Sequence, residues 1–411
     1  MYDWAVIEAW IEVAVRWTHV ITGIAWIGSS FYFIALDLGL RKSPDLPPGA
    51  HGEEWQVHGG GFYHVQKYLV APARLPEHLI WFKWESYATW LTGFAMLILV
   101  YYFGAEFYLI DPAVMDLSVW QAVAISLASL AFGWLAYDAI CKSRFGDNNT
   151  RLMLLLYVIL VVMAWGYTQV FSGRAAMLHL GAFTATIMSA NVFFIIMPNQ
   201  RIVVADLKAG RVPDPKYGKI AKQRSTHNNY LTLPVLFLML STHYPLVFAT
   251  EYNWVIASLV FLMGVTIRHY FNSRHAGTGN PTWTWVVTAI LFIICAWLST
   301  APMRNWPQEV RMDGAALVYA SAPGFEGVTS IVQGRCSMCH AAEPSWEGLM
   351  WPPKGVVLET PAQIAHEARR IYLQAGVTHA MPPANLSYME EPERDAIVRW
   401  FQSAGTGGIE G

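Results

Sequence analysis

Two cysteines and a histidine near the C-terminus have the spacing of a covalent haem attachment site. Residues 336–340 read Cys-Ser-Met-Cys-His, the C-x-x-C-H pattern of c-type haem. Two thiols one helical turn apart can reach the two vinyl groups of a haem, and the adjacent imidazole can ligate the iron. The alternative is a chance disulfide or half of a zinc site, but the sequence holds no second C-x-x-C. We predict that Cys336 and Cys339 attach haem c and that His340 ligates its iron.

A second axial ligand is expected farther along the chain. The segment His379-Ala380-Met381-Pro382-Pro383 offers Met381. A thioether opposite an imidazole raises the reduction potential, which suits a site that accepts electrons. Met381 as a core residue is the alternative use of that side chain. His379 is the other candidate ligand, and ligation by two histidines would lower the potential.

Three further histidines lie within or at the ends of apolar stretches: His19, His179 and His243. Ionisable residues inside a membrane are costly, so each is a functional candidate. A haem b held by two of them would be a physically sensible electron relay. The alternative is that hydrogen bonds between helices satisfy all three.

Another group of ionisable residues flanks the apolar stretches on the side that carries most of the basic charge. We single out His64, Glu85 and Arg268 as candidates for binding an anionic substrate or for general acid–base catalysis. Ordinary membrane-flanking charge and loop capping are the alternative. Glycines 59–61 match no nucleotide-binding motif. The whole group is His58, His64, Lys67, Glu85, Asp138, His227, Arg268, His269 and Arg274.

Eight stretches are apolar over about the 20 residues that a bilayer-spanning helix needs. With 55% hydrophobic and 14% charged residues, the chain departs from an ordinary soluble domain. A net charge of −2 without basic tracts excludes nucleic acid as the main partner. The predicted spans are Val13–Ala35, Ser86–Phe103, Ser118–Tyr137, Leu152–Val170, Ala176–Met197, Tyr230–Ala249, Trp254–Tyr270 and Trp283–Ala301.

The charge of the connecting loops predicts the orientation of these spans. The loops after the first, third, fifth and seventh stretches hold most of the Lys and Arg residues, whereas the opposite loops hold only Arg174. The positive-inside rule then places the basic loops in the cytoplasm and both termini in the periplasm. Haem c is attached outside the cytoplasmic membrane, so the predicted position of residue 411 agrees with the haem motif.

The apolar runs end near residue 301, which divides the chain. We predict an all-α fold: an eight-helix transmembrane bundle at 1–301, a linker at 302–323, and a small class I-like cytochrome c domain at 324–411. The last segment is too short for a large hydrophobic core and would gain from a buried prosthetic group.

Together these features resemble a known family. The residues Arg16-Trp17-Thr18-His19-Val20 through Ala25-Trp26-Ile27-Gly28, the glycine-rich segment His58–Tyr68 and the terminal C-x-x-C-H domain are similar to the bacterial membrane-bound urate oxidase (urate hydroxylase) fused to cytochrome c. The resemblance covers essentially the whole chain. Cys336, Cys339, His340 and Met381 are the residues that carry over from it.

The resemblance implies oxidation of urate to 5-hydroxyisourate in purine breakdown, in the bacterial inner membrane. Electrons would pass to the protein's own haem c, and then to a downstream cytochrome c or a terminal oxidase. The alternative is a non-catalytic, membrane-anchored cytochrome c that carries electrons within a respiratory complex. Eight spans and two long cytoplasmic loops exceed what an anchor needs. A haem–copper reductase is less suitable, since the spans lack its adjacent His-His pair.

Overall fold

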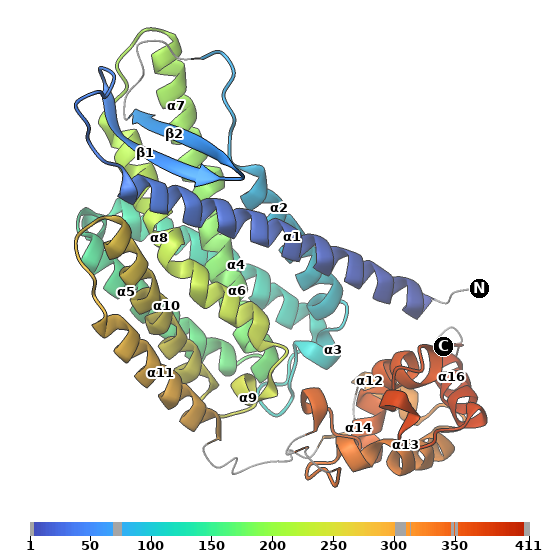
Figure 1. The fold of residues 1–411 in the computed structure, drawn as a ribbon. Helices are drawn as coiled ribbons and strands as arrows, with labels where there is room; N and C mark the ends of the chain where they lie inside the picture. The colour runs from blue at the N-terminus through green and yellow to red at the C-terminus, as the bar shows by residue number, and fades with distance from the viewer. Residues whose placement is uncertain are drawn as a thin grey trace.

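The computed structural model describes residues 4–68, 76–300, 310–312, 314–346, 349 and 352–406. The protein is mostly helical, with 72% helix and 5% strand. A bundle of long helices occupies the first 300 residues, and a smaller helical unit lies near the C-terminus (Figure 1). Residues 302–309 of the predicted linker, and the last residue of the eighth predicted span, lie outside the described residues.

The helices of the bundle follow the predicted apolar stretches in order. Helix α6 continues through the π-helical turn η3 into α7, where Pro198 lacks the N–H that a regular α-helical hydrogen bond requires. The bundle consists of α1 (Trp4–Gly39), α2 (Trp84–Met96), η1 (Leu97–Tyr102), α3 (Ala105–Tyr108), α4 (Val119–Lys142), η2 (Arg144–Asp147), α5 (Asn149–Thr168), α6 (Gly173–Ala190), η3 (Asn191–Ile196), α7 (Met197–Lys208), α8 (Pro215–Ser241), α9 (Pro245–Phe248), α10 (Asn253–His275) and α11 (Trp283–Thr300).

In the described part of the chain, six helices are long and apolar enough to cross a membrane. The predicted spans fall on the helices of the bundle, but Tyr230–Ala249 is interrupted after Ser241, where α8 ends and a turn leads to α9. This span and the one in α2–η1 fall outside the set of six. Helix α2 begins with Glu85 and Ser86, and the first half of α8 carries lysines, arginines and asparagines. Low hydropathy in these two helices therefore reflects polar residues, several of which face the interior of the bundle.

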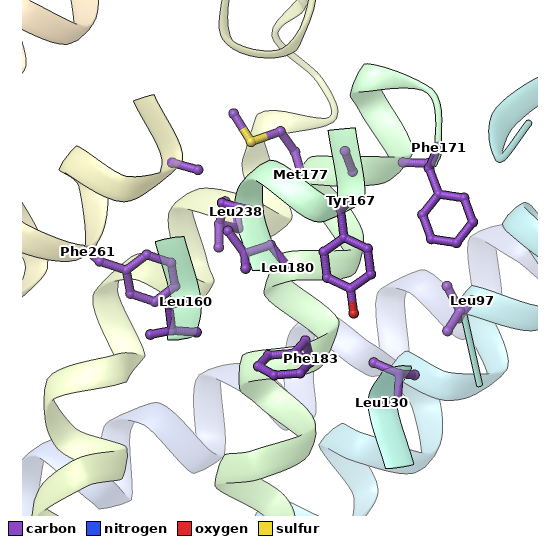
Figure 2. Packing of buried hydrophobic residues seen from close by; sticks show 14 of the residues in the cluster. Leu97, Leu130, Leu160, Tyr167, Phe171, Met177, Leu180, Phe183, Leu238 and Phe261 are labelled. Carbon is purple, nitrogen blue, oxygen red and sulfur yellow. The ribbon is translucent and has the colours of Figure 1, made fainter. Parts of the chain in front are cut away.

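The core of the bundle is built where α4, α5, α6, α8 and α10 pack together, and Figure 2 shows part of it around Leu180, Tyr167 and Phe183. A Cβ atom at Gly133 would lie 2.1 Å from Phe183, so only glycine lets this ring pack against α4. Outward-facing residues are largely apolar, among them Trp120, Phe132 and Phe292. An apolar exterior is expected of helices that contact lipid, and it is consistent with a membrane protein.

A β-hairpin departs from the all-α prediction. Strands β1 (Ala50–His58) and β2 (Gly61–Tyr68) pair antiparallel and follow α1 directly. Gly59 and Gly60 connect them with φ values of 59° and 81°. Two residues with positive φ form the turn whose twist suits a hairpin, and glycine adopts such values without strain. The glycine run that we had interpreted only as part of a long loop is therefore a hairpin turn.

The C-terminal unit has its own hydrophobic core. Trp400 is 1% exposed, and its indole N–H donates to the carbonyl oxygen of Tyr319 at 2.8 Å. Val328, Val332 and Ile397 complete the centre of this core. Its elements are α12 (Gly314–Ala320), α13 (Phe325–His340), η4 (Pro353–Gly355), α14 (Pro361–His366), α15 (Ala368–Ile371), η5 (Tyr372–Val377), η6 (Pro383–Asn385) and α16 (Glu391–Thr406).

Candidate functional site

The C-x-x-C-H residues form the last turn of α13. Cys336 and Cys339 are free thiols three positions apart, so they share one face of the helix. The ring Nδ1 of His340 donates to the carbonyl oxygen of Val356 at 2.9 Å. A hydrogen bond from Nδ1 to a backbone carbonyl orients an imidazole and leaves its Nε2 for a metal. The donor set therefore fits a covalently attached haem c.

The environment of the two thiols also fits that assignment. Burial raises the pKa of Cys336 to about 12, and burial raises the pKa of Cys339 as well. Both thiols are protonated at neutral pH, and a protonated thiol is a poor metal ligand and a poor nucleophile. A thioether has no proton to lose, so burial does not oppose it. Haem attachment is compatible with these surroundings and stays a prediction from the sequence.

The two candidates for the second axial ligand lie in different surroundings. Met381 is half-buried, and its backbone is held at both ends: its N–H donates to Gln374 at 2.9 Å, and its carbonyl accepts from Arg394 at 3.0 Å. His379 is exposed, with Nδ1 3.9 Å from a carboxylate oxygen of Glu391. A ligand held by fixed backbone hydrogen bonds is better preorganised for iron, which favours Met381.

His179 is fully buried in the bundle, and both of its ring nitrogens have protein partners. Nε2 lies 2.8 Å from the hydroxyl of Ser126, and Nδ1 lies 2.8 Å from the carbonyl oxygen of Ala175. The hydroxyl of Tyr102 lies 2.8 Å from the same Ser126 oxygen. Both nitrogens are thus engaged with protein groups here, and ligation of a haem b by His179 stays a prediction from the sequence.

The other two candidate haem b ligands lie in different places. His19 on α1 is half-buried, and its Nδ1 lies 3.0 Å from the carbonyl oxygen of Thr89 and 3.1 Å from the hydroxyl of Thr92. Gly93 makes room for this ring, because a Cβ there would lie 2.9 Å from it. His243 is exposed after the end of α8. Within the described residues no three His, Cys, Asp or Glu side chains form a metal-ion site. A membrane haem b stays a prediction from the sequence.

His64 lies on β2, in the hairpin. Its Nε2 is 2.7 Å from a carboxylate oxygen of Glu53, and its ring stacks on Trp55 with centroids 4.1 Å apart. Both contacts are with β1, so they join the two strands. This position separates His64 from the polar residues buried inside the bundle.

Buried and half-buried polar residues gather inside the bundle at its hairpin end, the end opposite the C-terminal unit (Figure 1). We call this cluster the polar layer; it consists of Tyr137, Asp138, Asn191, Arg224, His227, Asn228, Asn229, Arg268 and Asn272. One part of it faces α4 and η3. The Tyr137 hydroxyl lies 2.7 Å from Nδ1 of His227 and accepts from the amide of Asn191 at 3.1 Å. Arg224, which is 2% exposed, donates to Asp138 at 2.7 Å. Asn191 opens the π-helical turn η3, and such turns occur frequently at functional sites.

The other part of the polar layer faces α10 and α1. Arg268 is 5% exposed, and its guanidinium donates to Oδ1 of Asn229 at 3.3 Å and to Oδ1 of Asn272 at 3.0 Å. Its Cζ lies 4.1 Å from the ring centroid of Phe31. Of the three residues that we had singled out for chemistry, Arg268 is therefore the one placed in the polar layer.

Glu85 lies in the first turn of α2, and its buried Oε2 has no hydrogen-bond partner among the described residues. The next residue, Ser86, donates to Ser189 on α6 at 3.4 Å. Ser189 lies two residues before Asn191, so Glu85 approaches the same end of the bundle as the polar layer. An unsatisfied buried carboxylate oxygen is a candidate acceptor for a proton.

Sequence reasoning missed several members of the polar layer, above all Arg224, Tyr137 and the buried asparagines Asn191, Asn228 and Asn229. Two adjacent asparagines, Asn228-Asn229, beside His227 in a helix were the available signal, because amides are rare in a lipid-facing helix. The sixth predicted span begins at Tyr230, so a count of apolar residues alone places Arg224 in the loop before it.

Contacts of the C-terminal unit connect it to the other end of the bundle. Arg369 pairs with both Glu8 and Glu12 on α1, each at 3.3 Å. The guanidinium of Arg370 lies 5.2 Å from the ring centroid of Tyr108 on α3. Ring contacts continue inward from Tyr108 to Tyr101 and from Tyr101 to His179, at 6.3 and 6.0 Å. Aromatic side chains thus lead from this interface into the bundle.

These observations define the class as a mostly helical protein, consistent with a membrane protein, that carries a C-x-x-C-H sequence in a separate unit. A family model described as "Urate oxidase N-terminal" matches residues 5–299. The chain therefore belongs to the urate oxidase N-terminal family, and this membership indicates an oxidoreductase with a urate-related function. No curated protein and no solved structure among those compared gives a significant match.

Proposed function

We propose that the protein is a membrane-bound urate oxidase that converts urate to 5-hydroxyisourate and passes the electrons to its own haem c. The observation that carries the proposal is the joining, in one chain, of a helical bundle of the urate oxidase N-terminal family to a C-x-x-C-H helix whose histidine is oriented for iron. Haem c, when attached, supplies a one-electron acceptor. The bundle supplies substrate binding and proton transfer.

The reaction balances as a two-electron oxidation with addition of water. Urate and one water molecule yield 5-hydroxyisourate, two protons and two electrons, so the oxygen at C5 comes from water. Oε2 of Glu85 and Nε2 of His227, which have no hydrogen-bond partner among the described residues, are suited to accept the protons. The ring contacts from His179 through Tyr101 to Tyr108 support an outward route for electrons.

The proposal places the bundle in the bacterial inner membrane with eight spans and with both termini in the periplasm. Basic residues support this orientation, since Lys142, Arg144 and Lys208 lie at the ends of helices on the hairpin side. The contacts of Arg369 and Arg370 support a C-terminal unit at the opposite, periplasmic end. A downstream cytochrome c or terminal oxidase would then take the electrons from the periplasmic face.

The proposal is tested by adding urate to the purified, haem-loaded protein without oxygen. We expect the haem absorption spectrum to change to that of the reduced form, with two haems reduced per urate oxidised. With oxygen and an electron acceptor present, hydrogen peroxide should remain far below the urate consumed. Peroxide equal to urate would contradict electron transfer to haem c. A haem that urate leaves oxidised would instead favour a non-catalytic electron carrier.

Replacing Met381 with histidine is expected to lower the reduction potential of the haem, because an imidazole stabilises ferric iron more than a thioether does. A potentiometric titration followed by absorbance measures this change. His379→Ala is the matched control, because His379 is exposed on the same loop and should leave the potential unchanged. A potential that changes in His379→Ala and not in Met381→His would show that Met381 is not the ligand.

A further inference from the structure

We propose that Arg268, Asn229 and Phe31 form the binding site for the anionic ring of the substrate, a planar purine anion of which urate is the example. This inference rests on the proposed function and names the residues that bind the substrate. The three residues come from α10, α8 and α1, and they meet in the part of the polar layer that faces away from α4.

Arg268 carries a buried charge that no described carboxylate compensates. It is 5% exposed, and within the described residues no carboxylate lies within ion-pairing distance of it. Its partners are the neutral amide oxygens of Asn229 and Asn272. Removing a guanidinium from water without a counter-ion is costly, and neutral amides recover only part of that cost. An anionic ligand would supply the missing charge.

Arg224 provides an internal comparison. It is as deeply buried as Arg268 and comes from the same end of the bundle, but Asp138 lies 2.7 Å from its Nη2. The bundle thus provides a carboxylate for one buried arginine and only amides for the other. This difference is expected if the charge of Arg268 is reserved for a ligand and that of Arg224 is structural.

The amide of Asn229 places an unsatisfied hydrogen-bond donor beside the guanidinium of Arg268. Asn229 is 0% exposed; its Oδ1 accepts from both Arg268 and Asn272, and its Nδ2 has no partner among the described residues. Buried polar groups are nearly always hydrogen-bonded, so an unpaired amide N–H₂ points to an absent acceptor. A charged donor and an amide donor side by side suit the carbonyl oxygens and the deprotonated nitrogen of urate.

Phe31 completes the site. The Arg268 guanidinium lies over its ring, with Cζ 4.1 Å from the centroid. A cation–π contact holds the plane of the guanidinium and so fixes the direction of its donors. Arg268 and Asn229 provide charge and hydrogen-bond donors, and Phe31 orients the guanidinium, which suits recognition of a purine anion.

The test measures urate binding to full-length, haem-loaded protein reduced beforehand with dithionite, so that bound urate is not oxidised. Equilibrium dialysis gives Kd. Arg268→Gln should weaken binding about 100-fold, and Asn229→Ala about 10-fold, because charge-assisted hydrogen bonds are stronger than neutral ones. Arg274→Gln is the matched control: Arg274 is exposed on the same helix, and its replacement should leave Kd unchanged.

Folding is checked by covalent haem content and by thermal unfolding without urate. Because no described carboxylate pairs with Arg268, Arg268→Gln should unfold at the same temperature as the wild type or higher, and it should lose the stabilisation that urate gives the wild type. If this variant failed to fold, Arg268 would be a structural residue and the proposal would be overturned. Asn229→Ala tests the site by a second route.

The outcomes separate this proposal from the proposed function. If urate reduces the wild-type haem and both variants bind urate with unchanged Kd, the site is wrong and the function stands. If inorganic phosphate stabilises the wild type as well as urate does, and loses that effect in Arg268→Gln, the site binds phosphate groups, free or on lipid, and the purine assignment falls. If the wild type neither binds urate nor is reduced by it, the proposed function is wrong, and the site assignment falls with it.

Discussion

Replacing Cys336 and Cys339 together with serine is expected to remove the covalent haem and to lower urate oxidation to background. The two proposed thioether bonds are to these side chains, and without them a haem would have no covalent bond to the chain. The C-terminal unit is small, and a unit of this size gains stability from a buried prosthetic group. We also expect loss of the haem to destabilise this unit. A haem stain on a denaturing gel and the rate of urate consumption measure the two effects.

The matched control is Cys295→Ala on α11, which removes a free cysteine from the bundle and leaves the motif intact. This variant should keep its covalent haem and most of its activity. Full urate oxidation by the double serine variant, with oxygen as the acceptor, would show that the bundle works without haem c. Wild-type protein without haem after denaturation would refute the attachment site itself.

Inferences from local spacing or from composition are the ones that a sequence supports most directly. The C-x-x-C-H motif is read from five consecutive residues, which end α13, and the haem attachment inferred from it stays a prediction. Membrane-length helices follow from runs of apolar residues, and six of the eight predicted spans meet this description. Neither inference requires knowledge of which helices are neighbours.

The hairpin and the polar layer were missed for a shared reason: both depend on what surrounds a residue in space. Gly59 and Gly60 adopt positive φ because strands on either side pair, and nothing in the glycine run itself indicated those strands. Arg224 is buried because Asp138 on α4 and Asn191 on η3 surround it. A count of apolar residues treats such an arginine as the end of a span.

The histidines illustrate the same limit. The apolar stretch around His179 predicts a haem ligand, a prediction that stays untested, and it does not reveal the hydrogen bonds of its nitrogens to Ser126 and to the carbonyl of Ala175. Helical spacing shows which residues share a face, whereas the partner on the neighbouring helix decides whether a nitrogen is free. The sequence singles out Arg268 together with His64 and Glu85, but only the structure shows that Arg268 is buried with no carboxylate partner among the described residues.

Breaking the ion pair between Arg224 and Asp138 is expected to lower the stability of the bundle, and the loss should depend on which of the two residues is replaced. Asp138→Asn leaves a 2% exposed guanidinium without its carboxylate, and we expect it to destabilise the bundle by about 3 kcal/mol or more. Arg224→Met should cost less, because Asp138 is 17% exposed and keeps Lys142 as a partner at 2.6 Å. The free energy of unfolding in an SDS titration measures both.

The double variant tests whether the ion pair itself stabilises the bundle, or whether the bundle only requires that neither charge is buried without the other. A buried ion pair replaced by apolar residues of similar size is often neutral in stability, so Arg224→Met with Asp138→Leu should recover much of the loss seen in Asp138→Asn. Lys142→Met is the control, since an exposed pair contributes less than about 1 kcal/mol. Equal, additive losses in the two single variants would show that the residues act independently. In that case the contrast between a compensated Arg224 and an uncompensated Arg268 would lose its physical basis.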